Sequence, residues 1–342
     1  MSDVDGQRSR RSSPPQSKAR SGAADSVRVL GILAVVAGHT LAWPIVRPLL
    51  YSWHVPLFFF LAGYFWSSDR PLRQEVSART RSLLRPLIAW FVLIGIPFVL
   101  LDATMEDNTW ARLAVPFVNG QRSAMPYTTF WFAAVLFFSA VILRGLWTLP
   151  KPVIWSVAAC GLIVSFTAGP QLARTPLSIG SALPCIVFLT LGAVARTLRP
   201  RIRRAGRVGL GLLLVSAVSA GVGFTLPLDV KQGDFGTPVI STVVAVAISF
   251  GLVLVAEALF EHLPPTAGRI ATNLSYAGFM VILTHPLILW LMRTFGPPVP
   301  DWLLFAICLT IPWAAALAVL RSPVSGWLTG VHRQGRHQTR LA

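Results

Sequence analysis

The chain has 342 residues, of which 54% are hydrophobic and only 13% are charged, and its mean hydropathy is +0.63. Soluble domains carry about a quarter charged residues, so this composition excludes an ordinary soluble protein. The net charge is +17, but the basic residues lie in short clusters between apolar runs. That arrangement is typical of membrane topology signals and argues against a nucleic-acid partner.

The order of polar and apolar stretches predicts one membrane domain between two basic tails. Residues 1–24 are polar and rich in Arg, Ser and Pro, which predicts a disordered tail. Ten apolar segments follow, at about 27–43, 50–66, 86–101, 128–146, 151–168, 179–195, 208–224, 239–259, 272–294 and 302–319. We therefore predict an all-α polytopic membrane protein of about ten transmembrane helices, with its membrane domain at 25–320 and a basic cytoplasmic tail at 321–342.

The positive-inside rule predicts that both termini lie in the cytoplasm. With ten spans and the N-terminus inside, 24 of the 30 lysine and arginine residues fall in or beside cytoplasmic segments. The six that remain outside are Arg47, Arg112, Arg122, Arg174, Lys231 and Arg293. We predict an N-in, C-in protein of the plasma (inner) membrane.

The first apolar segment carries an arginine and a histidine eleven residues apart, Arg28 and His39. Eleven residues at about 100° each end about 20° past three full turns, so both side chains leave the same helix face. At about 1.5 Å per residue they stand roughly 16 Å apart, half the thickness of a bilayer. Ionisable residues at such depths indicate a functional site.

Two further histidines are predicted at the depth of His39. His54 opens the second span, and His285 lies in the outer half of the ninth. Three chemistries use such a set: metal or haem ligation, a proton relay in a transporter, and general base catalysis. No HExxH motif, closely spaced histidine pair or carboxylate cluster accompanies them, so we predict no metal site.

Basic residues at the entry to the third span predict an anion site on the cytoplasmic side. Arg81 and Arg85 are one helical turn apart, and Arg28 projects from the same predicted surface. Arginine binds phosphate through two parallel hydrogen bonds and keeps its charge at any physiological pH. We interpret these three residues as a site for a phosphorylated ligand.

Four motifs resemble the acyltransferase-3 family of integral-membrane proteins, which O-acylate sugars and glycolipids, and the fucose O-acetylase-like branch in particular. In chain order they are Asp25-x-x-Arg28 followed by His39, His54-Val-Pro56-Leu-Phe-Phe-Phe-Leu-Ala-Gly63-Tyr64, Arg81 with Arg85-Pro86, and Phe130-Trp131-Phe132. The chain departs from the family pattern in two places. Ala62 replaces a common Ser, and Ile282 replaces a Tyr three residues before His285-Pro286.

The resemblance implies transfer of an acetyl or other short acyl group from cytoplasmic acyl-CoA to a hydroxyl of an extracytoplasmic sugar, glycolipid or cell-envelope lipid. Arg28, Arg81 and Arg85 would then bind the CoA phosphates, and His39 would act as general base, assisted by His54 or His285. Tyr51, Tyr64 and Trp131 are candidate contacts for the acceptor, because aromatic rings stack on sugars. Acetyl-CoA would be a co-substrate, with no tightly bound cofactor.

Several alternatives stay open at this stage. A polytopic transporter or flippase of envelope lipid or sugar also uses intramembrane histidines, and a non-catalytic sensor is a third class. For an enzyme, the identity of the acceptor is also open. The Arg-rich composition is typical of a high-GC genome, and by analogy such a cell offers trehalose mycolates as acceptors.

Overall fold

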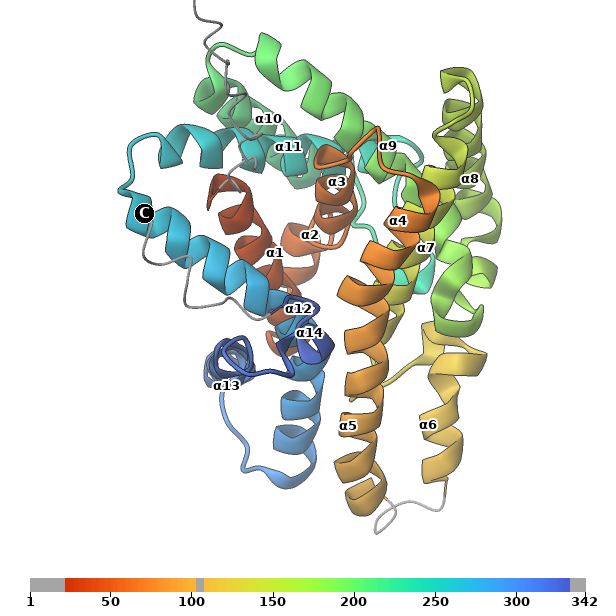
Figure 1. Cartoon of the computed structure of the whole chain (residues 1–342), viewed down its shortest axis with the longest axis vertical. Coiled ribbons are helices and arrows are strands. Elements are labelled where there is room, and N and C mark those ends of the chain that lie inside the picture. Colours follow the sequence, from red (N-terminus) through yellow and green to blue (C-terminus); the bar gives the residue numbers. More distant parts are fainter. Residues whose placement is uncertain (1–21, 103–107, 333–342) are drawn as a thin grey trace, which may run out of the picture.

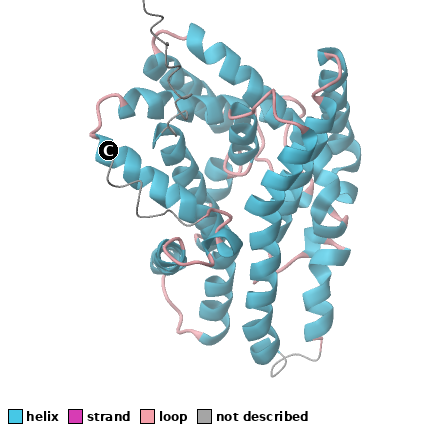
Figure 2. Cartoon of the chain, viewed as in Figure 1, coloured by secondary structure: helices cyan, strands magenta, loops and turns pink. Residues whose placement is uncertain are grey.

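The protein is built from helices throughout the part that the structure describes. This structure is a computed structural model that describes residues 22–102 and 108–332. These residues form no β-strand, only one isolated bridge between Asp229 and Asp234 (Figures 1 and 2). The predicted all-α class is confirmed. Most of the predicted N-terminal tail, residues 1–21, lies outside the described residues.

Within the described residues, seven helical stretches are long and apolar enough to cross a membrane. A span needs about 20 apolar residues because the hydrocarbon core is about 30 Å thick. The seven are α1 (Gly22–Thr40), Leu72–Asp102 (α4 Leu72–Arg79, η1 Thr80–Leu84 and α5 Arg85–Asp102), α8 (Lys151–Ala173), Pro176–Arg201 (η3 Pro176–Ser181, α9 Ala182–Leu198 and η4 Arg199–Arg201), α11 (Ile240–Phe260), α12 (Pro265–Phe295) and α13 (Asp301–Val319).

The other three predicted spans correspond to shorter helices. They are α3 (Pro56–Tyr64), α7 (Phe130–Leu146) and α10 (Ala205–Gly221). With nine residues, α3 is only about 14 Å long, and the short α2 (Val46–Leu50) and a turn precede it. The fold is therefore a multi-pass membrane bundle, while the count of ten spans and the N-in, C-in orientation stay predictions.

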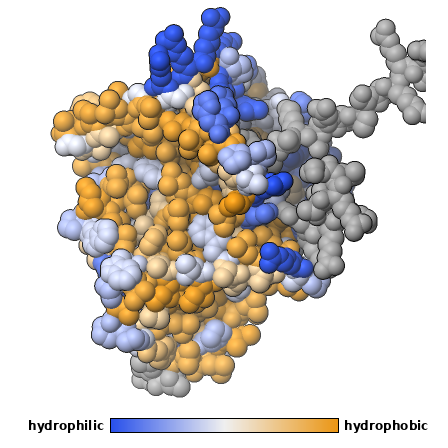
Figure 3. Space-filling view, turned by 90° about the vertical axis from the view of Figure 1, so that its left-hand side faces the viewer, coloured by the Kyte–Doolittle hydropathy of each residue, from blue (hydrophilic) through white to orange (hydrophobic). Residues whose placement is uncertain are grey.

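The outer surface of the bundle suits a lipid environment. Large apolar side chains are exposed on several long helices, for example Leu100 (67%) on α5 and Leu214 (66%) on α10. A space-filling view shows a broad hydrophobic face with hydrophilic residues gathered at its edges (Figure 3). Lipid tails can cover such a surface at no cost, whereas water cannot.

Close helix packing at glycines positions the elements that carry the site. Gly278 of α12 lies against Ile32 of α1, where an added Cβ would collide with the Ile32 side chain. Gly63 of α3 lies against the backbone carbonyl of Leu189 in α9, and a Cβ there would collide with that carbonyl. Small residues let membrane helices approach closely, so Gly63 serves helix packing.

Part of the predicted C-terminal tail folds onto the bundle. The short α14 (Ser325–Leu328) packs against α5, where the Trp90 Nε1 group donates to the Leu328 carbonyl at 2.8 Å. Gly330 then turns in the left-handed region (φ +74°) and closes against the backbone of Ser82. Residues 329–331 therefore reach the interior face of the bundle beside η1.

Candidate active site

One face of α1 lines two neighbouring internal cavities. Arg28 and Ile32 line the first cavity, and Val35 and His39 line the second. These residues are spaced i, i+4, i+7 and i+11, which is a single stripe of an α-helix. The predicted common face of Arg28 and His39 is therefore present, and it runs continuously from one cavity to the other.

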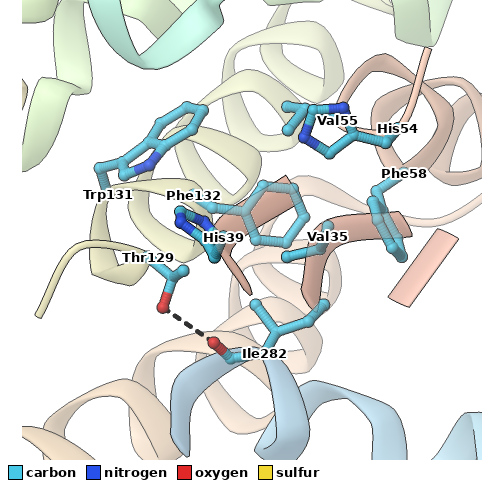
Figure 4. A pocket seen from close by; sticks show the side chains of 9 residues that line it. All are labelled: Val35, His39, His54, Val55, Phe58, Thr129, Trp131, Phe132 and Ile282. Atoms are coloured by element: carbon cyan, nitrogen blue, oxygen red, sulfur yellow. Dashed lines mark hydrogen bonds between the residues drawn. The ribbon is translucent and has the colours of Figure 1, made fainter. Parts of the chain in front are cut away.

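The second cavity, here called the histidine chamber, has a volume of about 30 Å³, room for one or two water molecules. Its walls come from α1, the α2–α3 segment, the start of α7 and α12 (Figure 4). It is lined by Val35, His39, His54, Val55, Phe58, Thr129, Trp131, Phe132 and Ile282. The predicted candidate Trp131 thus lies beside His39 and His54 in one enclosed space.

The structure brings the three predicted histidines together. The rings of His39 and His285 are 5.3 Å apart between centroids. His285 is fully buried, and its Nδ1 lies 3.0 Å from the Val281 carbonyl, while the Nδ1 of His54 lies 2.7 Å from the Leu50 carbonyl. A carbonyl oxygen only accepts, so both Nδ1 atoms must donate, and each Nε2 of a neutral ring is an acceptor. The His285 Nε2 atom is buried and has no hydrogen-bond partner in the described structure.

The His285-Pro286 pair in α12 explains how α12 is hydrogen-bonded to the start of α7 in the chamber wall. Pro286 lacks an N–H, so the carbonyl of Ile282, four residues earlier, loses its helical donor. The Thr129 hydroxyl, just before α7, donates to that carbonyl at 2.8 Å (Figure 4). Pro286 therefore interrupts the backbone hydrogen bonds of α12 and leaves a free carbonyl, which binds the residue before α7 to the chamber wall.

The first cavity, here called the arginine cavity, has a volume of about 240 Å³. Arg28 lines it and pairs at 2.5 Å with the fully buried Asp25. Two hydroxyls of α12 also donate to the Asp25 carboxylate, Thr272 at 2.8 Å and Ser275 at 3.1 Å. These hydrogen bonds hold α1 against α12, and the ion pair with Asp25 restricts the position of the Arg28 guanidinium group.

The second arginine of this cavity is Arg79, which the sequence interpretation did not include. Arg79 pairs with the buried Glu75 at 2.7 Å. Arg81 is exposed, and Arg85 stacks on the Trp327 ring at 5.1 Å, so neither lines the cavity. The expectation for Arg81 and Arg85 assumed a regular α-helix. The π-helical turn η1 (Thr80–Leu84) inserts a wider turn between them and changes which side chains face inward.

The two cavities share a wall of three side chains, Phe58, Phe132 and Ile282, here called the septum. The rings of Phe58 and Phe132 meet edge to face with centroids 5.4 Å apart. Ala62, which replaces the family's common Ser, lines the arginine cavity below the septum. The septum therefore lies between the cationic cavity and the histidine chamber.

The two predicted tyrosines lie outside the chamber. Tyr51 packs edge-on against His54 at 4.8 Å and points its hydroxyl at the Gly38 carbonyl, 3.5 Å away. Tyr64 lies at the other end of α3, where its hydroxyl donates to Glu257 at 3.3 Å and Arg196 covers its ring. The length of α3 separates Tyr64 from His54, so its assignment to the acceptor side conflicts with its position.

Lys231 is a residue that the sequence interpretation missed. It lies in the short η5 (Val230–Gln232), and its Nζ donates to the Ser123 carbonyl at 2.7 Å and to the Thr128 hydroxyl at 2.6 Å. Burial lowers the pKa of Lys231 to about 8, and nearby Asp229 acts in the opposite direction. Its charge acts electrostatically on His39. Only its place in a predicted outer loop marks it in the sequence.

The histidine set is not arranged as a metal site. Among residues 22–102 and 108–332, no three His, Cys, Asp or Glu side chains are grouped to hold a metal ion. The titratable groups that act on His39 are His54, His285, Lys231 and Arg293, and none of them is a carboxylate. The surroundings of His39 therefore favour an anion.

The bundle and its two adjoining cavities define a multi-pass membrane protein with an internal imidazole site. Residues 22–319 match the family model described as an acyltransferase domain, and the chain belongs to this acyltransferase-3 family. The family resemblance is thereby confirmed.

One curated protein is similar to half of the chain. Nodulation protein NolL of Mesorhizobium japonicum is 29% identical over 189 residues, which are 50% of this chain and 48% of NolL. The chain thus spans about half the length of that relative. No solved structure matches the chain.

Proposed function

We propose that this acyltransferase moves an acetyl or other short acyl group from cytoplasmic acyl-CoA to a hydroxyl of an extracytoplasmic sugar, glycolipid or cell-envelope lipid, in the plasma (inner) membrane. One observation carries the proposal. A single face of α1 runs from Arg28 in a cationic cavity to His39 among three imidazoles, with the septum between. This arrangement suits a donor and an acceptor that arrive from opposite sides.

At the donor end, Arg28 and Arg79 would bind the phosphates of CoA. Both guanidinium groups are held by buried carboxylates, Asp25 and Glu75, so their positions are set before the ligand arrives. The distance along α1 from Arg28 to His39 is roughly 16 Å, which an extended pantetheine arm can span. The thioester would then reach His39 through the septum.

At the reaction centre, His39 would act as general base. It takes the proton of the acceptor hydroxyl, the oxygen attacks the thioester carbonyl, and a tetrahedral oxyanion forms. The C–S bond then breaks, the ester is released, and the CoA thiolate takes the proton from the imidazolium of His39. General base catalysis of this kind contributes about 10²–10⁴ in rate.

The neighbours of His39 suit different parts of this step. With Nδ1 donating to a carbonyl, the unpartnered Nε2 of His285 is an acceptor for the N–H of a reoriented His39, which favours a positioning role over donation to the oxyanion. His54 has the same tautomer. Lys231, whose charge acts on His39, would stabilise the oxyanion.

The test is transfer of label from radiolabelled acetyl-CoA by purified protein in proteoliposomes that contain an envelope lipid extract. His39→Ala is expected to lower transfer by about 10²-fold or more. His262→Ala, which changes an exposed loop histidine, is the matched control. Wild-type transfer by His39→Ala would refute the general-base role. Movement of a sugar or lipid across the bilayer without thioester consumption would instead establish a transporter or flippase.

The donor site has its own test. Arg28→Ala is expected to raise the apparent KM for acetyl-CoA by about tenfold or more, since each hydrogen bond to a charged group contributes about 1.5–3 kcal/mol. The turnover number at saturating donor is expected to change less. An unchanged KM would remove Arg28 from the phosphate site.

A further inference from the structure

A groove distinct from the two cavities opens on the side of the bundle. It has a volume of about 340 Å³ and lies between the α2 segment, α10 and α11. It is lined by Ile45, Pro48, Leu49, Ser52, Trp53, Leu213, Ser216, Ala217, Ala220, Gly221, Ile248 and Leu252. An engineered apolar cavity of about 150 Å³ already binds benzene, so this groove has room for a longer alkyl chain.

The chemistry of the groove selects an apolar occupant. Two of its polar side chains bond to the protein backbone, with Trp53 Nε1 donating to the Leu49 carbonyl at 2.9 Å and Ser52 Oγ to the Pro48 carbonyl at 3.2 Å. The α10 wall is a stripe of small residues, which makes the groove deep. Ile45 and Leu49 at the mouth are each 60% exposed, on a surface that lipid tails cover.

The groove adjoins the reaction centre through the α2 segment. Residues 45, 48, 49 and 52 face the groove, whereas Arg47, Tyr51 and His54 recur at helical spacing on another face. Arg47 pairs with Asp229 at 3.3 Å and lies over the Tyr51 ring, which contacts His54. An alkyl chain in the groove therefore lies on one side of a short helix. On the other side of that helix are the polar cluster of Arg47, Asp229 and Tyr51 and, next to it, the histidine chamber.

We propose that this groove holds the alkyl chain of a lipid-linked acceptor, whose hydroxyl-bearing head group contacts Arg47, Asp229 and Tyr51 on its way to His39. The inference rests on the proposed function and narrows its acceptor class to lipids. An unattached sugar would leave the groove unused.

The test separates chain binding from acyl transfer. Purified protein in phosphatidylcholine vesicles is labelled with a decyl glucoside that carries a diazirine in its chain, and the labelled peptides are mapped. We expect label in the segments that line the groove, displaced by excess unmodified decyl glucoside. Ala217→Trp fills the groove, and Val218→Trp, one residue further on and exposed to lipid, is the matched control.

Groove labelling is expected to fall about tenfold or more in Ala217→Trp and to stay at the wild-type level in Val218→Trp. The indole ring would occupy the volume that the chain needs, so a steric block is the reason for the expected fall. Ala220→Leu, a smaller change in the same stripe, gives the same result if Ala217→Trp folds poorly. Labelling that excess decyl glucoside does not displace, or that both tryptophan variants retain equally, would show bulk lipid in the groove and overturn the proposal.

Acetyl transfer, measured on the same samples, is the second readout. Ala217→Trp is expected to lose transfer to decyl glucoside while retaining transfer to methyl glucoside, which has no chain to place. Equal loss for both glucosides would overturn the assignment of the groove to the acceptor. If wild-type protein binds the chain in the groove but consumes no acetyl-CoA, the proposed function fails while the lipid site stands.

Discussion

The hydrogen bond between Thr129 and Ile282 is expected to exist only because of Pro286. Thr129→Val keeps the side-chain shape but removes the hydroxyl that donates to the Ile282 carbonyl at 2.8 Å. The carbonyl is buried and has no helical N–H partner. Interhelical hydrogen bonds in membrane proteins average about 0.6 kcal/mol and reach about 1.7 kcal/mol. An orphaned buried acceptor shifts the value upward, so we expect a loss of about 1–1.5 kcal/mol in the free energy of unfolding.

A double-mutant cycle isolates the cause. In Pro286→Ala, the new N–H at position 286 can donate to the Ile282 carbonyl, so adding Thr129→Val is expected to cost less than about half as much. Unfolding is followed by tryptophan fluorescence during titration of mixed micelles with dodecyl sulfate. Thr284→Val is the control, because its hydroxyl bonds within its own helix to Met280. Equal losses in both backgrounds would refute the role of Pro286.

Two predictions concern charged residues that the sequence interpretation did not assign. Arg79→Ala is expected to raise the KM for acetyl-CoA by about tenfold, and Arg81→Ala by less than about twofold, because Arg79 lines the arginine cavity and Arg81 does not. A larger effect of Arg81→Ala than of Arg79→Ala in steady-state kinetics would contradict this placement. Wild-type turnover is expected to fall as the pH rises through about 8, where Lys231 loses its proton. Lys231→Met is expected to lower turnover about tenfold below pH 8 and to abolish the fall in turnover at higher pH. Lys231→Arg is expected to retain turnover at higher pH. An unchanged fall in Lys231→Met would exclude the Lys231 ammonium group as its cause.

The parts of the site that could be predicted from the sequence are those that depend on the geometry of one helix. The common face of Arg28 and His39 follows from about 100° per residue, and α1 is regular throughout this stretch. The approach of His285 to His39 followed less directly, from equal depth in two spans. Their contact also needs the glycine packing of α1 on α12, which depth alone does not predict.

The errors arise where the chain departs from regular geometry or closes over a long distance. Arg81 and Arg85 were placed on one face of an α-helix, but a π-turn redirects them and brings Arg79 inward. Lys231 reaches Ser123 and Thr128 across more than a hundred residues of sequence, which no local pattern indicates. Tyr64 was grouped with the acceptor residues because aromatic rings stack on sugars, although α3 carries it away from His54.

The sizes of the two cavities bear on how transfer avoids hydrolysis. The histidine chamber has room for one or two water molecules, whereas the arginine cavity is several times larger. For the proposed transfer, an acyl thioester can reach His39 only when the rings of Phe58 and Phe132 move apart. While they are in contact, the two rings narrow the way for water from the arginine cavity to His39. Displacement of the septum by the pantetheine arm would therefore open the chamber and fill the opening in the same step. His39 would then activate the acceptor hydroxyl and not water.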